Sequence, residues 1–377
     1  MSASYTIEEN KLSIHDFKDR FDYWTSQEWR DQITTLAIDD GAAEIPDGAF
    51  QYFKRLEEVR LPSSLKRIGD SAFSQCEALK KISLPDGLES LGNYAFQDTP
   101  GLRELTLPAS LTVLGEQALY IGSGSHLCAV RAAVENPAYA SADGVLFSKD
   151  MTKLIKYPSA KRLAEYRVPE TVTEIAGDAF AHTNYLHRLE LPKSLRVLGS
   201  GAFSFCVHLE ELRIPETVEG IPSYAFFCCE RMERLVLPAR IKYLGYESIC
   251  NCSRLKELIL PPGFTQLDYA AVGGNGRLKE LVIPEGVTEL NNSALIDNIG
   301  LRRVVLPSTL TAVWDHAFQR CRSLKEIEIP ENVEYIDDEA FLGCTGLRRV
   351  ILRTKHIRDD HWLPDELKAK VRIEYAI

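Results

Sequence analysis

The sequence predicts a β-rich repeat solenoid, and three features of the 377-residue chain support this fold class. A proline recurs every 23 residues in two runs, from Pro62 to Pro108 and from Pro169 to Pro330. A small residue followed by a large apolar residue keeps the same step, as in Ala72-Phe73. A short segment of alternating polarity precedes most of the prolines. A fixed period of roughly 20–50 residues is typical of solenoids and propellers.

One rung, meaning one turn of the solenoid, shows how the repeat is expected to fold. The segment Leu79-Lys80-Lys81-Ile82-Ser83-Leu84 alternates near its end, which predicts a strand with its apolar side chains inward. Pro85 ends this strand because it has no N–H to donate. A second short strand follows at Leu88-Glu89-Ser90-Leu91-Gly92, whose glycine permits a tight corner. Ala95 is small where backbones crowd, and Phe96 fills the middle of the rung.

The two ends of the chain lack the repeat and are expected to cap it. Residues 1–32 contain a possible strand at 12–14 and roughly helical spacing of aromatic residues over 15–30. The solenoid is expected over 33–352, and a second cap with a helical turn and a closing strand over 353–377. Caps are needed because a terminal rung otherwise exposes its apolar end face and a free strand edge.

The rung at about 132–168 is longer than the others. Two short apolar runs, 143–147 and 153–158, flank the polar turn Ser148-Lys149-Asp150 and predict a β-hairpin. This insertion is either a structural elaboration of the rung or a lip that contacts a ligand.

The repeat motif resembles that of one known family. Each full copy has an Ala-Phe pair, a Cys three residues later, a Leu three residues after that, and a Leu-x-x-Ile-x-Leu-Pro strand. This pattern resembles the BspA-type leucine-rich repeat family over roughly residues 33–352. The resemblance implies a curved, right-handed leucine-rich-repeat array, with a parallel sheet on its concave face and short strands and turns on the other side. Members of the family are generally non-catalytic binding proteins, often on the surface of bacteria or protists.

Six of the nine cysteines share one repeat position, three residues after the large apolar residue. Thr99 and Thr183 occupy the same position in other rungs, so this position favours a small, weakly polar, buried side chain. The six are Cys76, Cys206, Cys229, Cys252, Cys321 and Cys344. The remaining three, Cys128, Cys228 and Cys250, have no such explanation and no metal-ligand spacing with histidine.

The composition excludes several classes of function. A net charge of −10 argues against nucleic acid as the main partner, and no apolar run is long enough to insert into a membrane. The amino terminus lacks the apolar core of a signal peptide, which favours a cytoplasmic protein. The alternative is a secreted or cell-surface protein whose leader was removed.

No catalytic or cofactor-binding constellation stands out, so we expect neither an enzyme nor a cofactor. Cys206 and His208 could be imagined as a thiolate and its base, but the cysteine falls in the buried column. His356, Asp359, Asp360 and His361 could be imagined as metal ligands, but a solvated polar loop explains them as well.

The outward positions of the predicted sheet suggest a binding surface. One column of outward positions is charged almost throughout, and the other changes from polar to apolar over four successive rungs. An apolar stripe on an exposed sheet face favours a partner-binding or self-association site, although strand propensity alone is an alternative explanation. The stripe consists of Val236, Ile259, Val282 and Val305, and its charged neighbours are Arg234, Glu257, Glu280 and Arg303.

The sequence thus predicts a non-catalytic protein-binding scaffold that uses the concave face of a solenoid. The alternative is a cell-surface adhesin that recognises a host protein or glycan, and an enzyme is a more distant third. The expected partner is a protein of unknown identity, and the chain itself is expected to be a monomer or to self-associate weakly.

Overall fold

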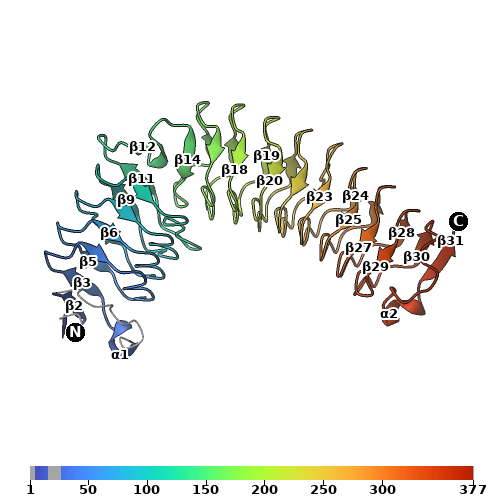
Figure 1. Ribbon diagram of the computed structural model, residues 1–377, viewed down its shortest axis with the longest axis horizontal. Helices are drawn as coiled ribbons and strands as arrows, with labels where there is room; N and C mark the ends of the chain where they lie inside the picture. Colours follow the sequence, from blue (N-terminus) through green and yellow to red (C-terminus); the bar gives the residue numbers. More distant parts are fainter. Residues whose placement is uncertain (1–4, 16–26, 377) are drawn as a thin grey trace. The chain divides into compact units, whose positions relative to one another are not determined.

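The computed structural model describes residues 5–15 and 27–376, which divide into two compact units. Unit 1 comprises Met1–Arg162 and Ala176–Tyr185, and unit 2 comprises Leu163–Ile175 and Leu186–Ile377. In each unit successive rungs stack on one another, with a longer strand on one face and a shorter strand on another (Figure 1). We call the surface formed by the longer strands the sheet face.

The strands of unit 1 fall into three groups. Its sheet face contains β1 (Tyr5–Glu8), β2 (Lys11–Ile14), β3 (Thr35–Ile38), β5 (Glu58–Arg60), β7 (Lys81–Ile82), β9 (Glu104–Leu107) and β11 (Ala129–Ala132). The short strands are β4 (Glu44–Ile45), β6 (Arg67–Ile68), β8 (Ser90–Leu91) and β10 (Val113–Leu114). The inserted strands are β12 (Tyr139–Ala142), β13 (Val145–Ser148) and β14 (Lys153–Lys156).

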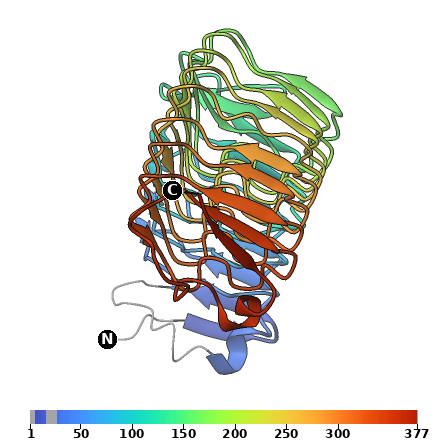
Figure 2. The ribbon, with the colours of Figure 1, turned by 90° about the vertical axis from the view of Figure 1, so that its right-hand side faces the viewer.

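Unit 2 repeats the same two strand types over more rungs, as the orange and red strands of Figure 2 show. Its sheet face contains β15 (Glu165–Arg167), β17 (Arg188–Glu190), β19 (Glu211–Arg213), β21 (Arg234–Val236), β24 (Glu280–Val282), β26 (Arg303–Val305), β28 (Glu326–Ile329), β30 (Arg349–Leu352) and β31 (Arg372–Tyr375). Its short strands are β16 (Glu174–Ile175), β18 (Val197–Leu198), β20 (Gly220–Ile221), β22 (Tyr243–Leu244), β23 (Gln266–Leu267), β25 (Glu289–Leu290), β27 (Ala312–Val313) and β29 (Tyr335–Ile336).

Parallel pairing between rungs confirms the predicted solenoid. Glu58 of β5 pairs with Lys81 of β7, and Glu280 of β24 pairs with Arg303 of β26, each 23 residues apart. The core is a column of large apolar side chains, in which Phe50, Phe73 and Phe96 are all fully buried. Their rings stack with centroids 5.4 and 5.7 Å apart, so each rung buries its aromatic side chain on its neighbours.

Glycine at the corner after the short strand serves a different purpose from the one predicted. Gly92 is not in the left-handed region, so the tight corner does not depend on its backbone freedom. A Cβ atom on Gly92 would instead lie 2.5 Å from the backbone nitrogen of Asp70 on the preceding rung. The close approach of neighbouring rungs is therefore what requires glycine here.

Both ends of the described chain close over an apolar rung. At the amino end, most of the segment expected to be helical lies outside the described residues, and its described end is α1 (Gln27–Arg30). The Trp29 ring lies 6.0 Å from that of Phe53, edge to face. At the carboxyl end, α2 (Asp365–Lys368) precedes β31, and the Trp362 ring lies 5.8 Å from Phe341.

The long rung of unit 1 contains the expected hairpin, extended by a third antiparallel strand. β13 pairs with β14 across the turn after Ser148, and β12 pairs with the other edge of β13. The turn between β12 and β13 consists of Asp143 and Gly144, both with positive φ, as two-residue hairpins require.

Among the described residues, no helix has the length and apolar character needed to cross a bilayer.

Candidate functional site

The four residues of the apolar stripe lie on the sheet face of unit 2. Ile259 and Val282 are 68% and 57% exposed, while Val236 and Val305 are half-buried. Val282 and Val305 are direct neighbours, because they pair in register on β24 and β26. Their side chains point away from the core, since the alternate residues Leu281 and Val304 are buried. A row of exposed apolar side chains on one sheet face is a candidate interaction surface.

The sheet is interrupted on the same rungs that carry the stripe. The strands β15-β17-β19-β21 form one sheet, β24-β26 a second, and β28-β30-β31 a third. Residues 257–260 form only an isolated bridge, from Glu257 to Arg234. Residues 186–376 are described throughout. Within them, no backbone hydrogen bond joins 257–260 to β24, and none joins β26 to β28. Of the four stripe residues, Ile259 therefore lies among peptide groups that lack partners in the sheet, whereas Val282 and Val305 pair with each other.

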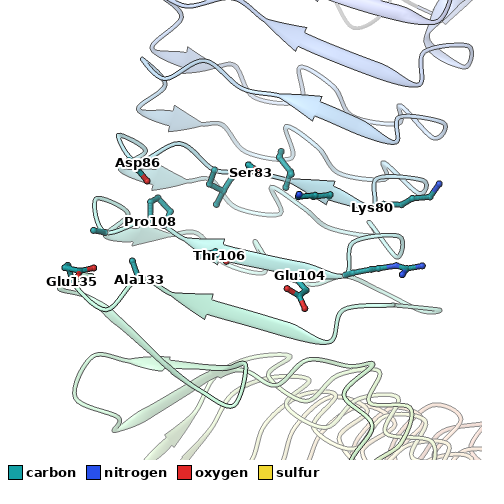
Figure 3. Close-up of a pocket in the computed structure, with 13 residues that line it drawn as sticks. Lys80, Ser83, Asp86, Glu104, Thr106, Pro108, Ala133 and Glu135 are labelled. Carbon is teal, nitrogen blue, oxygen red and sulfur yellow. The ribbon is translucent and has the colours of Figure 1, made fainter.

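A second observation at these interruptions is a hollow in the sheet face. In unit 2 a cavity of about 750 Å³ lies across β26 and β28, and Arg303 and Val305 are among the residues that line it. In unit 1 a cavity of about 1010 Å³ lies across β7 and β9, which do not pair (Figure 3). Ser83, which directly follows β7, and Thr106 of β9 line this second cavity. Each hollow thus marks a place where neighbouring strands separate.

The charged residues beside the stripe are exposed. Arg234 lies 3.4 Å from Glu211 on the preceding rung, an exposed ion pair that contributes little to stability. Glu257, Glu280 and Arg303 make no ion pair within the part of unit 2 that the structure describes. These three side chains are therefore available to a partner.

A column of basic residues runs beside this charged column, one position earlier in each rung. We call it the basic ladder, and it consists of Lys256, Lys279, Arg302, Lys325 and Arg348. The Arg302 amide donates to the Lys279 carbonyl over 2.7 Å, and the Arg348 amide to that of Lys325 over 2.9 Å. The members on successive rungs are therefore neighbours.

Most of the basic ladder is free to bind an anionic group. Lys256 pairs with Glu233 at 2.6 Å, and this contact lowers the pKa of the Glu233 carboxyl. Lys279, Arg302 and Lys325 are exposed and make no ion pair with any described residue. Sequence reasoning missed the ladder, because it followed only the outward strand positions. The ladder could have been found by comparing the residues that directly follow the repeated leucine of each rung, such as Leu278.

The six cysteines of the shared repeat position are all fully buried. The thiols of Cys76, Cys229, Cys252, Cys321 and Cys344 donate to the backbone carbonyl of the large apolar residue one rung earlier. Cys229, for example, donates to Phe203 over 3.1 Å, and Cys344 donates to Phe318 over 3.0 Å. Burial raises the pKa of the Cys344 thiol to about 12, which suppresses the reactive thiolate. Cys206 belongs to this column, whereas His208 packs against His187 with ring centroids 5.5 Å apart.

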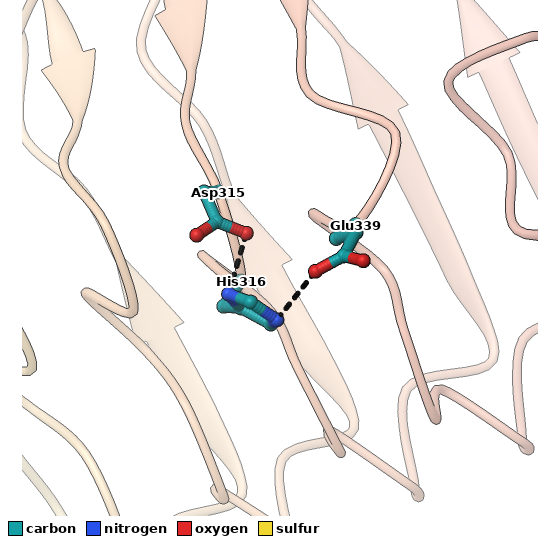
Figure 4. A group of neighbouring side chains, drawn as sticks. All are labelled: Asp315, His316 and Glu339. Carbon is teal, nitrogen blue, oxygen red and sulfur yellow. Dashed lines mark ion pairs between the residues drawn. The ribbon is translucent and has the colours of Figure 1, made fainter.

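One group of three metal-type ligands occurs among the described residues, and it is not the one considered from the sequence. Asp315, His316 and Glu339 bring their ligand atoms within 4.8 Å of one another (Figure 4). Nδ1 of His316 lies 2.5 Å from Asp315, but Nε2 lies 2.8 Å from Glu339. The two carboxylates thus face opposite ring nitrogens, and a single ion binds only one of these nitrogens. The geometry therefore places the His316 ring between two carboxylates and does not suit the binding of one metal ion by all three side chains.

Comparison with known proteins agrees with the repeat pattern. The profile of the family described as "BspA type Leucine rich repeat region (6 copies)" matches residues 29–127, 157–275 and 273–360. A leucine-rich repeat protein from Eubacterium ventriosum is similar, at 22% identity and a TM-score of 0.60, over 89% of this chain and 90% of the other. The pneumococcal vaccine antigen PcpA is similar at 23% identity and a TM-score of 0.58, over 99% and 96%. A search of curated protein sequences finds no relative.

These two structural likenesses show a shared fold, since both identities are below 25%. The family profile carries more weight, because its three matched segments cover most of the chain. Leucine-rich-repeat proteins of this kind are typically non-enzymatic scaffolds. The chain belongs to the BspA-type leucine-rich repeat family.

Proposed function

We propose that this chain is a non-catalytic protein-binding scaffold, and that the sheet face of unit 2 is its binding surface. The observation that carries the proposal is the coincidence of two features on the same rungs. Ile259 and Val282 expose apolar side chains, and the peptide groups of 258–260, after the bridge at Glu257, lack backbone partners in the sheet. A protein segment satisfies both at once, because it offers apolar side chains for burial and peptide groups for hydrogen bonding.

The charges of this face indicate the chemistry of the partner. Lys279 of the basic ladder and Val282 of the stripe lie on the same rung, three residues or about 10 Å apart along an extended strand. The occupant is therefore a protein segment that places apolar side chains on the stripe and acidic side chains against the ladder. Such charge complementarity sets orientation and the rate of association more than the total affinity.

The test is a selection from a random peptide library displayed on phage, with the whole protein immobilised. The selected peptides should be rich in apolar and acidic residues. The double variant Ile259→Asp with Val282→Asp should weaken their binding at least tenfold without lowering the melting temperature. Val113→Asp with Val197→Asp is the matched control, because these short-strand valines are 56% and 51% exposed. The control should bind like the unaltered protein.

Three results would overturn the proposal. No peptide family is enriched, or the enriched peptides bind the Ile259→Asp, Val282→Asp variant as tightly as the unaltered protein. Alternatively, sedimentation shows that the unaltered protein dimerises and this variant does not, which makes a second copy the occupant.

A ladder variant, Lys279→Gln with Arg302→Gln, should also bind the selected peptides more weakly, and its binding should depend less on salt.

An adhesin is the second candidate, and it differs mainly in where the protein is found. The likeness to a pneumococcal vaccine antigen favours it, although that likeness shows the fold alone. Protease treatment of intact cells that make the protein separates the two readings. Digestion of the protein on intact cells supports the surface location, and protection until the cells are lysed supports the cytoplasmic one.

A further inference from the structure

Unit 1 contains a cavity of about 500 Å³ that none of the features above explains. It lies beside an irregular turn that leads into β11. From Leu119 to Leu127 the chain uses eight steps, whereas regular rungs use six, for example from Phe96 to Leu102. The longer turn forms part of the cavity wall. A volume of this size is within the range of pockets that bind small molecules.

The cavity is lined by cationic groups and by no acidic ones. Arg103 and Arg162 both line it and are exposed, and neither makes an ion pair within the described residues. Arg162 is held over the ring of Tyr185, with 5.8 Å from its guanidinium carbon to the ring centroid. Glu104, the acid next to Arg103 in sequence, is bound by Arg131 at 2.7 Å. None of the nine lining residues carries a carboxylate, although the chain has a net charge of −10.

Neutral donors face the same space. Gly124 and Ser125 line the cavity, and their amides donate no hydrogen bond among the described residues. Gly124 has φ +71°, and successive amides around such a left-handed residue form a concavity that attracts anions. The His126 ring is fixed by its Nδ1, which lies 3.0 Å from the Pro100 carbonyl. This bond leaves the other ring nitrogen for a ligand.

We propose that this cavity binds an oxyanion, namely a phosphate, sulfate or carboxylate group carried on a small molecule. Guanidinium groups match the planar or tetrahedral arrangement of oxyanion oxygens with paired N–H donors. The volume exceeds what one inorganic ion needs, so the anionic group belongs to a larger molecule such as an acidic or phosphorylated sugar. This site is in unit 1 and does not depend on the protein-binding surface proposed for unit 2.

The test is titration calorimetry of the whole protein at low salt with four probes. These are inorganic sulfate, inorganic phosphate, glucose 6-phosphate and glucuronate. At least one should bind saturably, and Arg103→Gln with Arg162→Gln should weaken it at least tenfold. The control, Arg60→Gln with Arg213→Gln, removes the same charge from exposed sheet-face positions and should bind normally. Comparison of the sugars with the inorganic ions shows which carrier the cavity prefers.

A second readout is independent of affinity. Cys128 is exposed and lines the cavity, so a bound probe should slow its reaction with an uncharged thiol reagent. The proposal is overturned if no probe binds saturably, if the Arg103, Arg162 variant binds as well as the unaltered protein, or if the control loses affinity equally. It is also overturned if a saturating probe leaves the labelling rate of Cys128 unchanged.

Discussion

His182 lies in a small polar network inside unit 1, where the long rung departs from the repeat. Its Nε2 is 2.8 Å from the Tyr120 hydroxyl, and burial beside Lys156 lowers the pKa of His182 to about 4. In the same network the Lys156 ammonium donates to the Asp178 carbonyl over 2.9 Å. Burial raises the pKa of the Asp178 carboxyl.

The pH dependence of stability should report the burial of His182. The folded state keeps this imidazole neutral down to about pH 4, while the unfolded state protonates near the ordinary pKa of 6.5. The unfolded state thus binds more protons in this window. The contribution of His182 to the free energy of unfolding is therefore full above pH 6.5 and is lost as pH falls towards 4. We expect the free energy of unfolding to fall by roughly 2 kcal/mol between pH 7 and pH 5 because of this residue.

Denaturant unfolding of the protein and of His182→Gln at several pH values measures this loss. The carboxylates titrate alike in both proteins. The difference between their two curves of unfolding free energy against pH therefore isolates His182. The difference should shrink as the pH falls from 7 to 5. A constant difference over that range would mean that the histidine is not buried in its neutral form.

At the scale of a single element, asparagine replaces cysteine in the shared repeat position on two successive rungs. Asn275 donates to the Ile249 carbonyl over 2.8 Å, and Asn298 to that of Val272 over 2.6 Å. The Asn298 side-chain oxygen also accepts the amide of Asn275 over 3.0 Å. A thiol at this position donates to the carbonyl of the preceding rung but does not also accept an amide in this way. Asparagine therefore joins these rungs by more hydrogen bonds than cysteine does. Both rungs have lost the central aromatic ring, which has become Val272 and Leu295.

Removal of this side chain should be costly. Asn298→Ala leaves the Val272 carbonyl and the Asn275 amide buried without partners, and we expect a loss of about 3 kcal/mol in unfolding free energy. Asn298→Cys restores the donor and should lose less. Asn292→Ala, at an exposed position of the same rung, serves as the control and should stay close to the unaltered protein. An equal effect of Asn298→Ala and Asn292→Ala in urea unfolding would refute this role.

At the scale of the whole molecule, the repeat period was sufficient to predict the architecture. The 23-residue step places Glu58 beside Lys81 and Val282 beside Val305, as the strand pairing shows. The alternation of each strand also predicted that Ile259 and Val282 point outward. These features follow from the sequence because a repeat aligns equivalent residues in space.

Other features had no such signal. The sheet is interrupted between β26 and β28, although the residues of both strands are ordinary strand formers. The arginines of the unit 1 cavity, Arg103 and Arg162, come from different rungs joined by an irregular turn and an insertion, so no fixed period connects them. The basic ladder could have been read from the repeat, because its residues share one position in successive rungs.

The central claim is that the sheet face of unit 2 binds a protein segment, and hydrogen exchange of the complex tests it most directly. The amides of 258–260 and those between β26 and β28 lack backbone partners in the sheet and should exchange quickly in the free protein. With a selected peptide bound at saturation, exchange should slow at these amides and at Val282. Protection confined to other parts of the chain, with unchanged exchange at 258–260, would contradict the account.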